Sequence, residues 1–157
     1  MYHAIVCRRT RSLLDSMSRG DPAPVLAAFA PDATHVFIGA HAMSGRRVTP
    51  EGIRAWYARL RRLLPDLRFT AHRIGVAGPP WATLAVVERT ETNSATDGVE
   101  TSAQGVHVLH LRWGRITRML ILTDRSALQA TLDRSATTSG GESLAPPIDE
   151  RPGWPRP

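Results

Sequence analysis

The chain has 157 residues, enough for one domain with a hydrophobic core and too few to expect two. No apolar run approaches the roughly 18 residues that a membrane-spanning helix needs, so we expect no such helix. The single cysteine, Cys7, excludes an intrachain disulfide and argues against a cysteine-based metal site.

The formal net charge of +6 at first suggests a nucleic acid or an acidic membrane as a partner. However, every basic residue other than histidine is an arginine, and the chain is rich in Ala, Gly and Pro, a composition that GC-rich codons explain. The arginines are mostly scattered and lack interleaved aromatic residues that would stack on bases. We therefore expect neither nucleic acid nor membrane as a partner. The N-terminus does not have the charge order of a secretory signal, which predicts a cytoplasmic protein.

The first part of the chain favours two helices and a short strand. Apolar residues recur at helical spacing from Tyr2 to Met17, which predicts the first helix. Asp21 is a good N-cap for a short second helix in the run APVLAAFA. The phrase PDATHVFIG then indicates a turn and a brief strand that carries His35 and Phe37 on one face.

The third helix is the clearest element of the sequence. It begins after the N-cap Thr49, has Pro50 in its first turn and stops before Pro65. Its apolar stripe consists of Ile53, Trp56, Tyr57, Leu60, Leu63 and Leu64.

The second half of the chain predicts strands, separated by the turn signals AGPP, NSATDG and WGR. The four expected strands are Arg68 to Val76, Trp81 to Thr92, Thr101 to Arg112 and Arg115 to Thr123. This order predicts an α+β fold, with a curved, mainly antiparallel sheet wrapped around the three N-terminal helices. Asp124 is expected to cap a short helix, RSALQATL. The composition then changes to Pro, Gly and Ser, so we expect one domain over residues 1–133 and a disordered tail over residues 134–157.

The order of these elements, together with the phrase FAPDAT and the helix GIRAWYARL, resembles the nuclear transport factor 2-like superfamily of cone-shaped α+β proteins. The resemblance covers about Tyr2 to Leu132. It implies a deep, mostly apolar pocket that the curved sheet and the helices enclose. Branches of the superfamily place different polar groups in that pocket, so the fold alone does not determine the chemistry.

Two branches are most similar. The phrase VERTE, followed by GVHVLHLRWGRITRMLILTD, is similar to the limonene-epoxide-hydrolase-like branch, and the ending ILTDRSALQATL resembles the SnoaL-like polyketide cyclases. The hydrolase resemblance implies that Arg89 and Glu91 stand where that branch has an arginine and its first acid. The second acid corresponds to Ile121, and the two residues that steady the attacking water correspond to His35 and Phe37. The water site of that branch is therefore incomplete here.

A resemblance to the steroid-isomerase branch concerns His107, which stands where that branch has the acid that helps to bind the oxyanion. Strand alternation places His107 on the inward face with Gly105 and Leu109, whereas His110 points the other way. The two histidines therefore cannot share a metal ion. Since the sequence supplies no further ligand, we expect no metal site.

Each candidate residue also has a structural interpretation. Arg89 and Glu91 lie two residues apart, hence on one face of a strand, and form either a surface ion pair or part of the pocket. The preceding residues on that face are mostly apolar, which favours the pocket. His35 and His107 are either core histidines or pocket residues, and an unperturbed pKa near 6.5 suits a base. Tyr57 is a core residue by default, with the pocket as the alternative.

The resulting hypothesis is a small-molecule enzyme of secondary metabolism that opens an epoxide or closes a ring within one apolar or aromatic substrate. A cyclase uses a nucleophile of the substrate itself, so it needs no held water, which fits the incomplete water site. Arg89 would orient Glu91, and Glu91 would donate to the reacting oxygen. Either His35 or His107 would accept the proton of the attacking hydroxyl. This chemistry requires no cofactor or metal.

The expected substrate contacts are Phe37, Tyr57, Leu109, Met119 and Ile121. Two alternatives stay open beside the cyclase or epoxide-hydrolase-like enzyme. One is a non-catalytic protein that binds an apolar ligand, and the other is a ketosteroid-isomerase-like enzyme that shuttles protons with its histidines.

The outward face of the sheet predicts a homodimer. An open antiparallel sheet needs its second face covered when that face is apolar. The side chains expected there are Val106, Val108, Leu120 and Leu122.

Overall fold

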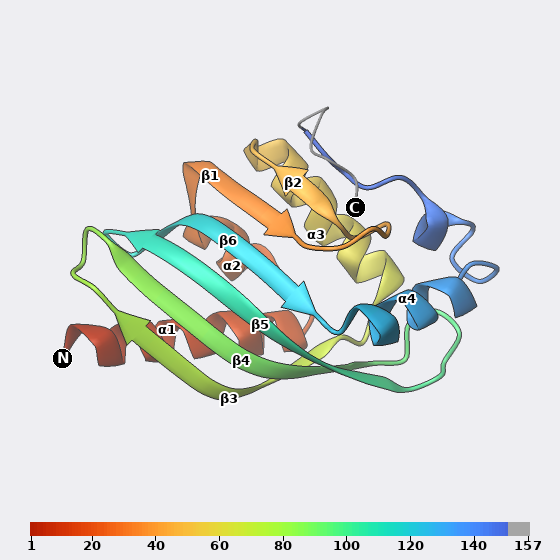
Figure 1. Cartoon of the computed structure of the whole chain (residues 1–157), viewed down its shortest axis with the longest axis horizontal. Coiled ribbons are helices and arrows are strands. Elements are labelled where there is room, and N and C mark those ends of the chain that lie inside the picture. The colour runs from red at the N-terminus through yellow and green to blue at the C-terminus, as the bar shows by residue number, and fades with distance from the viewer. Residues whose placement is uncertain (151–157) are drawn as a thin grey trace.

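A computed structural model describes residues 1–150, and Figure 1 shows how its elements are arranged. The helices are α1 (Tyr2–Ser18), α2 (Ala23–Ala28), α3 (Pro50–Leu63) and α4 (Arg125–Arg134), with a 3₁₀ helix, η1, at Glu142–Leu144. The strands are β1 (Phe29–Phe37), β2 (Gly45–Arg47), β3 (Arg68–Ala77), β4 (Thr83–Asn93), β5 (Thr101–Arg112) and β6 (Arg115–Thr123). The three N-terminal helices and four long strands were predicted to within two residues of these bounds. Within residues 1–150, no helix is both long enough and apolar enough to cross a membrane.

The strands form one sheet in the order β2-β1-β6-β5-β4-β3. Strands β1 and β6 are parallel, and all other neighbouring strands are antiparallel. In Figure 1 the sheet lies in front and α1, α2 and α3 lie behind it. Helices therefore cover one face of the sheet, and the other face is turned to the viewer. The expected α+β fold with a mainly antiparallel, open sheet is confirmed.

Alternation along the strands decides which side chains enter the core. In β4 every second residue from Thr83 to Asn93 is buried, and the residues between them are exposed or half-buried. The register of β4, β5 and β6 places Val87, His107 and Ile121 side by side in one row. This row faces residues of α1 and α3 across the interior.

Helix α3 closes the core with the apolar stripe that its sequence predicted. The buried residues of this stripe are Ile53, Trp56, Tyr57, Leu60 and Leu63. Burial of one large apolar side chain contributes about 1.5–3 kcal/mol, so the stripe holds the helix against the sheet. The N-cap is also as predicted, because the Thr49 hydroxyl accepts a hydrogen bond from the N–H of Gly52 at 3.0 Å.

Two features of the first half differ from the sequence-based prediction. The phrase PDAT belongs to β1 and is not a turn, but the pairing of β1 with β6 is irregular between Phe29 and Thr34. Pro31 lies in this irregular part, where a residue without an N–H interrupts the hydrogen-bond ladder least. Strand β2 was not predicted, because three residues are too few to show alternation.

The segment after α4 differs from the expected disordered tail. Residues 135–150 pack on the domain: Glu142 forms an ion pair with Arg62 at 2.6 Å, and Ile148 packs against the core. Composition did not reveal this, because the contacts join residues far apart in the sequence. Residues 151–157 lie outside the described part of the chain, so the disorder predicted for them stays a prediction.

Glu150 connects this segment to the start of α3. Its carboxylate accepts hydrogen bonds from the N–H groups of Val48 and Thr49 at 2.5 and 2.8 Å, and another from the Thr49 hydroxyl. A Cβ at Gly52 would lie 2.4 Å from a Glu150 carboxylate oxygen, so the glycine makes room for this contact. The negative charge also lies at the N-terminal end of a helix, where the helix dipole favours it.

Truncation tests the contribution of this segment. We expect the chain that ends at residue 136 to melt below the chain that ends at residue 150, because it lacks the Ile148 and Glu150 contacts. A loss of about 2 kcal/mol would lower the melting temperature by roughly 4–8 °C in a domain of this size. Thermal unfolding followed by circular dichroism gives the comparison. Equal melting temperatures would show that residues 137–150 behave as a disordered tail.

Candidate active site

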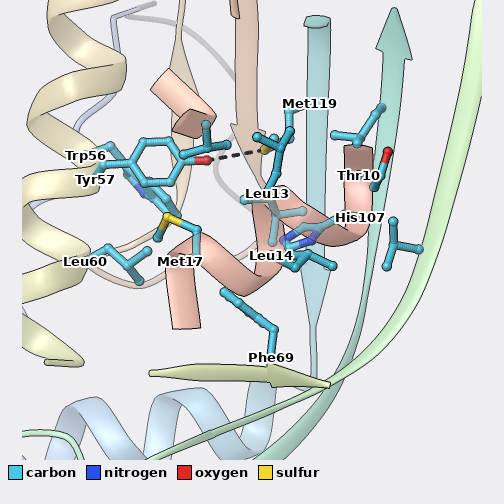
Figure 2. A pocket seen from close by; sticks show the side chains of 14 residues that line it. Thr10, Leu13, Leu14, Met17, Trp56, Tyr57, Leu60, Phe69, His107 and Met119 are labelled. Atoms are coloured by element: carbon cyan, nitrogen blue, oxygen red, sulfur yellow. Dashed lines mark hydrogen bonds between the residues drawn. The ribbon is translucent and has the colours of Figure 1, made fainter. Parts of the chain in front are cut away.

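The sheet, α1 and α3 enclose a largely apolar pocket (Figure 2). Its empty volume is about 480 Å³ including the opening, but its cavity volume is only about 40 Å³. The helices contribute Thr10, Leu13, Leu14, Met17, Val25, Trp56, Tyr57 and Leu60, and the sheet contributes Phe69, Val87, His107, Leu109, Met119 and Ile121. The pocket is therefore preformed but narrow. A ring-bearing ligand requires flexible side chains such as Met17 and Met119 to move.

His107 projects from β5 into this pocket (Figure 2). Its ring meets that of Phe69 edge to face, with 5.8 Å between the ring centroids. Neither ring nitrogen has a hydrogen-bond partner among residues 1–150. Burial, and then the positive charge of Arg89, hold the pKa of His107 well below 6.5, so the imidazole is neutral at pH 7. A neutral imidazole with free nitrogens can donate a hydrogen bond to a ligand and accept a proton from it.

Two hydroxyl groups complete the polar part of the lining. The Tyr57 hydroxyl donates to the thioether sulfur of Met119 at 3.6 Å, a weak acceptor (Figure 2). Burial raises the pKa of Tyr57, so the phenol stays protonated at neutral pH. The Thr10 hydroxyl comes from α1 and has no hydrogen-bond partner within the described residues. Both hydroxyls are therefore available to a ligand oxygen.

Arg89 and Glu91 form a buried ion pair beside the pocket, and neither side chain lines it. The side chains are 1% and 7% exposed, which excludes a surface ion pair. Arg89 donates to the Glu91 carboxylate at 2.5 Å and to the Thr123 hydroxyl at 3.1 Å. The guanidinium also lies over the ring of Phe69, at 4.9 Å from its centroid. Burial lowers the pKa of Arg89, and the charge of Glu91 partly offsets this effect.

Gly105 makes room for this ion pair. Arg89, Gly105 and Thr123 lie side by side in β4, β5 and β6. A Cβ at Gly105 would lie 3.0 Å from Nη2 of Arg89 and 2.5 Å from the carbonyl oxygen of Leu122. The next inward position of β5 is His107, so the guanidinium lies one row from the imidazole. This proximity explains the effect of Arg89 on the pKa of His107.

His35 lies in the core and does not line the pocket. It is the register partner of Arg47, whose Nη2 donates to Nδ1 of His35 at 2.7 Å. The other ring nitrogen, Nε2, is buried without a partner among the described residues. Burial, Arg47 and His107 lower the pKa of His35 well below 6.5. A histidine held in this way is not placed to act as a base on a pocket ligand, unlike the sequence-based expectation.

Phe37 is also buried outside the pocket lining. Its ring packs against the rings of His41 and Trp56, with centroid distances of 5.2 and 6.0 Å. Of the nine expected site residues, those that line the pocket are His107, Tyr57, Leu109, Met119 and Ile121. The structure does not bring Arg89, Glu91, His35 and Phe37 to its surface.

Sequence reasoning did not assign nine of the fourteen lining residues to the site, and two of these, Thr10 and Phe69, bear on its chemistry. Thr10 is a hydroxyl residue within the apolar stripe of the first helix, a signal that was available. Phe69 gave no such signal, because a single aromatic residue in a strand is usual.

Asp124 caps α4 as predicted, and it accepts from the N–H groups of Ser126 and Ala127. No cluster of three His, Cys, Asp or Glu side chains suited to a metal ion occurs within residues 1–150.

Comparisons with known proteins agree with this architecture. A family model described as a SnoaL-like domain matches residues 10–119. No curated protein matches the chain. Among solved structures, the chain is similar to a nuclear transport factor 2-like protein of unknown function from Burkholderia pseudomallei K96243. The two share 19% identity over 85% of this chain and 96% of that protein, with a TM-score of 0.69.

Two further structures extend the comparison. A protein from Jannaschia sp. CCS1, provisionally named a SnoaL-like polyketide cyclase, shares 17% identity over 85% of this chain and 91% of its own, with a TM-score of 0.65. TerC, co-crystallised with polyporic acid, shares 17% identity over 82% of this chain and 98% of its own, also with a TM-score of 0.65. At these identities the likeness concerns the fold.

Titration of His107 tests the electrostatic description. We expect NMR to find its pKa well below 6.5, because burial and Arg89 disfavour the imidazolium. The double substitution Arg89→Met with Glu91→Leu removes the charged pair and fills the space with apolar groups. It should raise the pKa of His107, because the positive neighbour is lost while the burial remains. The ring-proton chemical shift of His107 against pH gives both values.

Arg68→Met is the matched control, because Arg68 is an exposed arginine of β3. It should leave the pKa of His107 unchanged. A pKa near 6.5 in the unmodified protein would contradict the buried, neutral imidazole. An unchanged value in the double variant would show that Arg89 does not act on His107.

Proposed function

Because the chain belongs to the SnoaL-like domain family, we propose that it is an enzyme that closes a ring within one small apolar or aromatic substrate. The observation that carries this proposal is His107, a neutral imidazole with unpartnered nitrogens that faces a mainly apolar pocket. The similarity to the Jannaschia protein supports the reaction class. The crystallisation of TerC with polyporic acid supports a small organic acid as the type of ligand.

In the proposed reaction a nitrogen of His107 accepts the proton of the attacking group, which is a hydroxyl or a carbon next to a carbonyl. The attacking atom forms the ring bond to an electrophilic carbon of the same molecule. The oxygen on that carbon gains negative charge as its epoxide bond or carbonyl π bond breaks, and the Tyr57 hydroxyl donates a hydrogen bond to it. The proton on His107 then returns to this oxygen. The product is an isomer of the substrate, and no water is consumed.

This assignment differs from the sequence-based hypothesis in the role of Glu91. The carboxylate is paired with Arg89 at 2.5 Å and does not line the pocket. The carboxylate of Glu91 accepts from Arg89 outside the pocket, whereas the hydroxyl of Tyr57 lines the pocket, and its raised pKa keeps its O–H available as a hydrogen-bond donor. Arg89 and Glu91 are therefore positioning residues that act through His107 and Phe69.

Epoxide hydrolysis has less support than ring closure. The positions that hold water in the epoxide-hydrolase-like branch correspond to His35, Phe37 and Ile121. Phe37 and Ile121 are apolar register partners in β1 and β6, and Nδ1 of His35 accepts from Arg47. A general base must lie within about 3 Å of the proton that it takes, directly or through one water. These three side chains offer no such base to a water molecule in the pocket.

Non-catalytic binding of an apolar ligand is the second candidate function. The lining favours it, because most of the side chains around the pocket are hydrocarbon and Glu91 stays outside. A binding protein would keep its affinity when His107 is replaced and would convert no substrate. Turnover therefore separates the two functions.

Substitution of His107 tests the catalytic proposal. We expect His107→Gln to lower the rate of ring closure by about 10²- to 10⁴-fold, because an amide does not exchange a proton as an imidazole does. The assay incubates the protein with hydroxy-epoxides and with aryl chains that carry two carbonyl groups, and mass spectrometry follows the products. A product of unchanged mass indicates ring closure, and a gain of one water indicates hydrolysis.

Asp124→Asn is the control, because Asp124 caps α4 outside the pocket and asparagine also caps well. It should keep the rate of the unmodified protein. An undiminished rate in His107→Gln would remove His107 from the mechanism. Ligand binding without turnover by the unmodified protein would favour the non-catalytic function.

We also propose that the protein is a homodimer formed through the outer face of the sheet. An apolar row on this face consists of Val86, Val108, Leu120 and Val36, which are register partners across β4, β5, β6 and β1. Val86 is 37% exposed, and Leu122 in the next row is 39% exposed. Figure 1 shows no described helix over this face. A second copy would remove these side chains from water.

Leu120→Arg should convert this dimer to a monomer, because a charge at the centre of an apolar interface loses its hydration without gaining a partner. Light scattering at micromolar concentration measures the mass. Thr70→Arg on the edge strand β3 is the control and should leave the mass unchanged. A monomeric mass for the unmodified protein would contradict the proposed dimer.

A further inference from the structure

A second cavity lies between the N-terminal half of α1 and the strands β5 and β6. Its empty volume is about 490 Å³ including the opening, and its cavity volume is about 90 Å³. Thr10, Leu13 and Leu109 line both this cavity and the pocket of His107. The two cavities therefore meet at these side chains and lie end to end along α1.

The second cavity opens to solvent beside exposed side chains. Every side chain that lines the pocket of His107 is buried or half-buried. In the second cavity, by contrast, Ile5 is 46% exposed and Arg9 is also exposed. A ligand that enters here passes Thr10 and Leu13 before it reaches His107.

Arg9 gives this opening a positive charge. It is the one charged side chain among the residues that line either cavity within the described chain. Its guanidinium extends toward the turn between β5 and β6, since Nη1 lies 3.1 Å from the position of a Cβ built at Gly114. Unlike Arg89, Arg9 has no ion pair or hydrogen bond with any of residues 1–150. Its donors are therefore free for a ligand.

We propose that the two cavities form one elongated site for an amphipathic organic acid. The apolar, ring-forming part of the substrate lies in the pocket of His107, and its carboxylate lies at the guanidinium of Arg9. A planar guanidinium can bind a carboxylate through two parallel hydrogen bonds, which holds the acid end of the chain at the opening. The attacking and attacked carbons then lie deeper, against His107. This inference rests on the proposed function and specifies its class of substrate.

Two fluorescent dyes test the site, because they share one ring system and differ in charge. 8-Anilino-1-naphthalenesulfonate carries a sulfonate that stands in for the carboxylate, and N-phenyl-1-naphthylamine lacks it. We expect Arg9→Gln to weaken binding of the sulfonate dye by about 5- to 20-fold, the size of a lost charge-assisted contact. Binding of the neutral dye should stay nearly the same. Arg8→Gln is the matched control, because Arg8 is the exposed neighbour that lines neither cavity.

Equal effects of Arg8→Gln and Arg9→Gln on the sulfonate dye would overturn the proposal, because they would show a general effect of net charge. Equal weakening of both dyes by Arg9→Gln would also overturn it and would assign Arg9 a packing role. Failure of both dyes to bind the unmodified protein would exclude one site for a ring-bearing acid. His107→Gln should leave the affinity for both dyes nearly unchanged. The dye measurements therefore test the proposed site at Arg9 independently of the proposed ring closure at His107.

Discussion

A guanidinium group that is buried away from water needs hydrogen-bond acceptors from the protein. The buried Arg89 therefore requires such acceptors on the inner face of the sheet. It takes one acceptor from Glu91 on its own strand and another from Thr123 two strands away. Gly105 on the strand between them has no side chain, which leaves the space that the guanidinium occupies. The ring of Phe69 lies against it. Loss of Glu91 alone would leave a buried charge unpaired, at a cost of about 3–5 kcal/mol.

Arg47 meets the same constraint at the other side of the core. It is fully buried, and this burial lowers its pKa to about 9. Its guanidinium donates to Nδ1 of His35 and to the backbone carbonyl groups of Ser44 and Ile148. Residues 135–150 therefore supply one of the acceptors that the burial of Arg47 requires. His35 supplies another, which is why a histidine that looks catalytic in the sequence is part of the core.

The spacing of apolar residues in the sequence, every second residue in a strand and every third or fourth in a helix, indicates which face of the element is buried. The helices and strands could therefore be predicted better than the residues that line the pocket. The stripe of α3 and the alternation of β4 were predicted for this reason. The same spacing does not indicate which residues of a buried face line the pocket and which are covered by other side chains. Arg89 and His107 share the inner face, but the pocket includes only His107, and Phe69 from a neighbouring strand lies over the guanidinium of Arg89. Glu150 was unpredictable because its partners, Val48 and Thr49, lie about a hundred residues away.

The depressed pKa of His107 limits the reactions that the pocket can perform. An imidazole that resists protonation accepts a proton most readily from an acidic group, so among the proposed substrates it favours those that attack through an acidic hydroxyl, such as a phenol, or through a carbon between two carbonyl groups. The imidazolium that forms lies one row from Arg89, and like charges repel. Glu91 reduces this repulsion, because it balances the charge of Arg89 within the ion pair. In the proposed reaction, the buried pair therefore controls how strong a base His107 is without touching the substrate, and this strength limits which substrates His107 could activate.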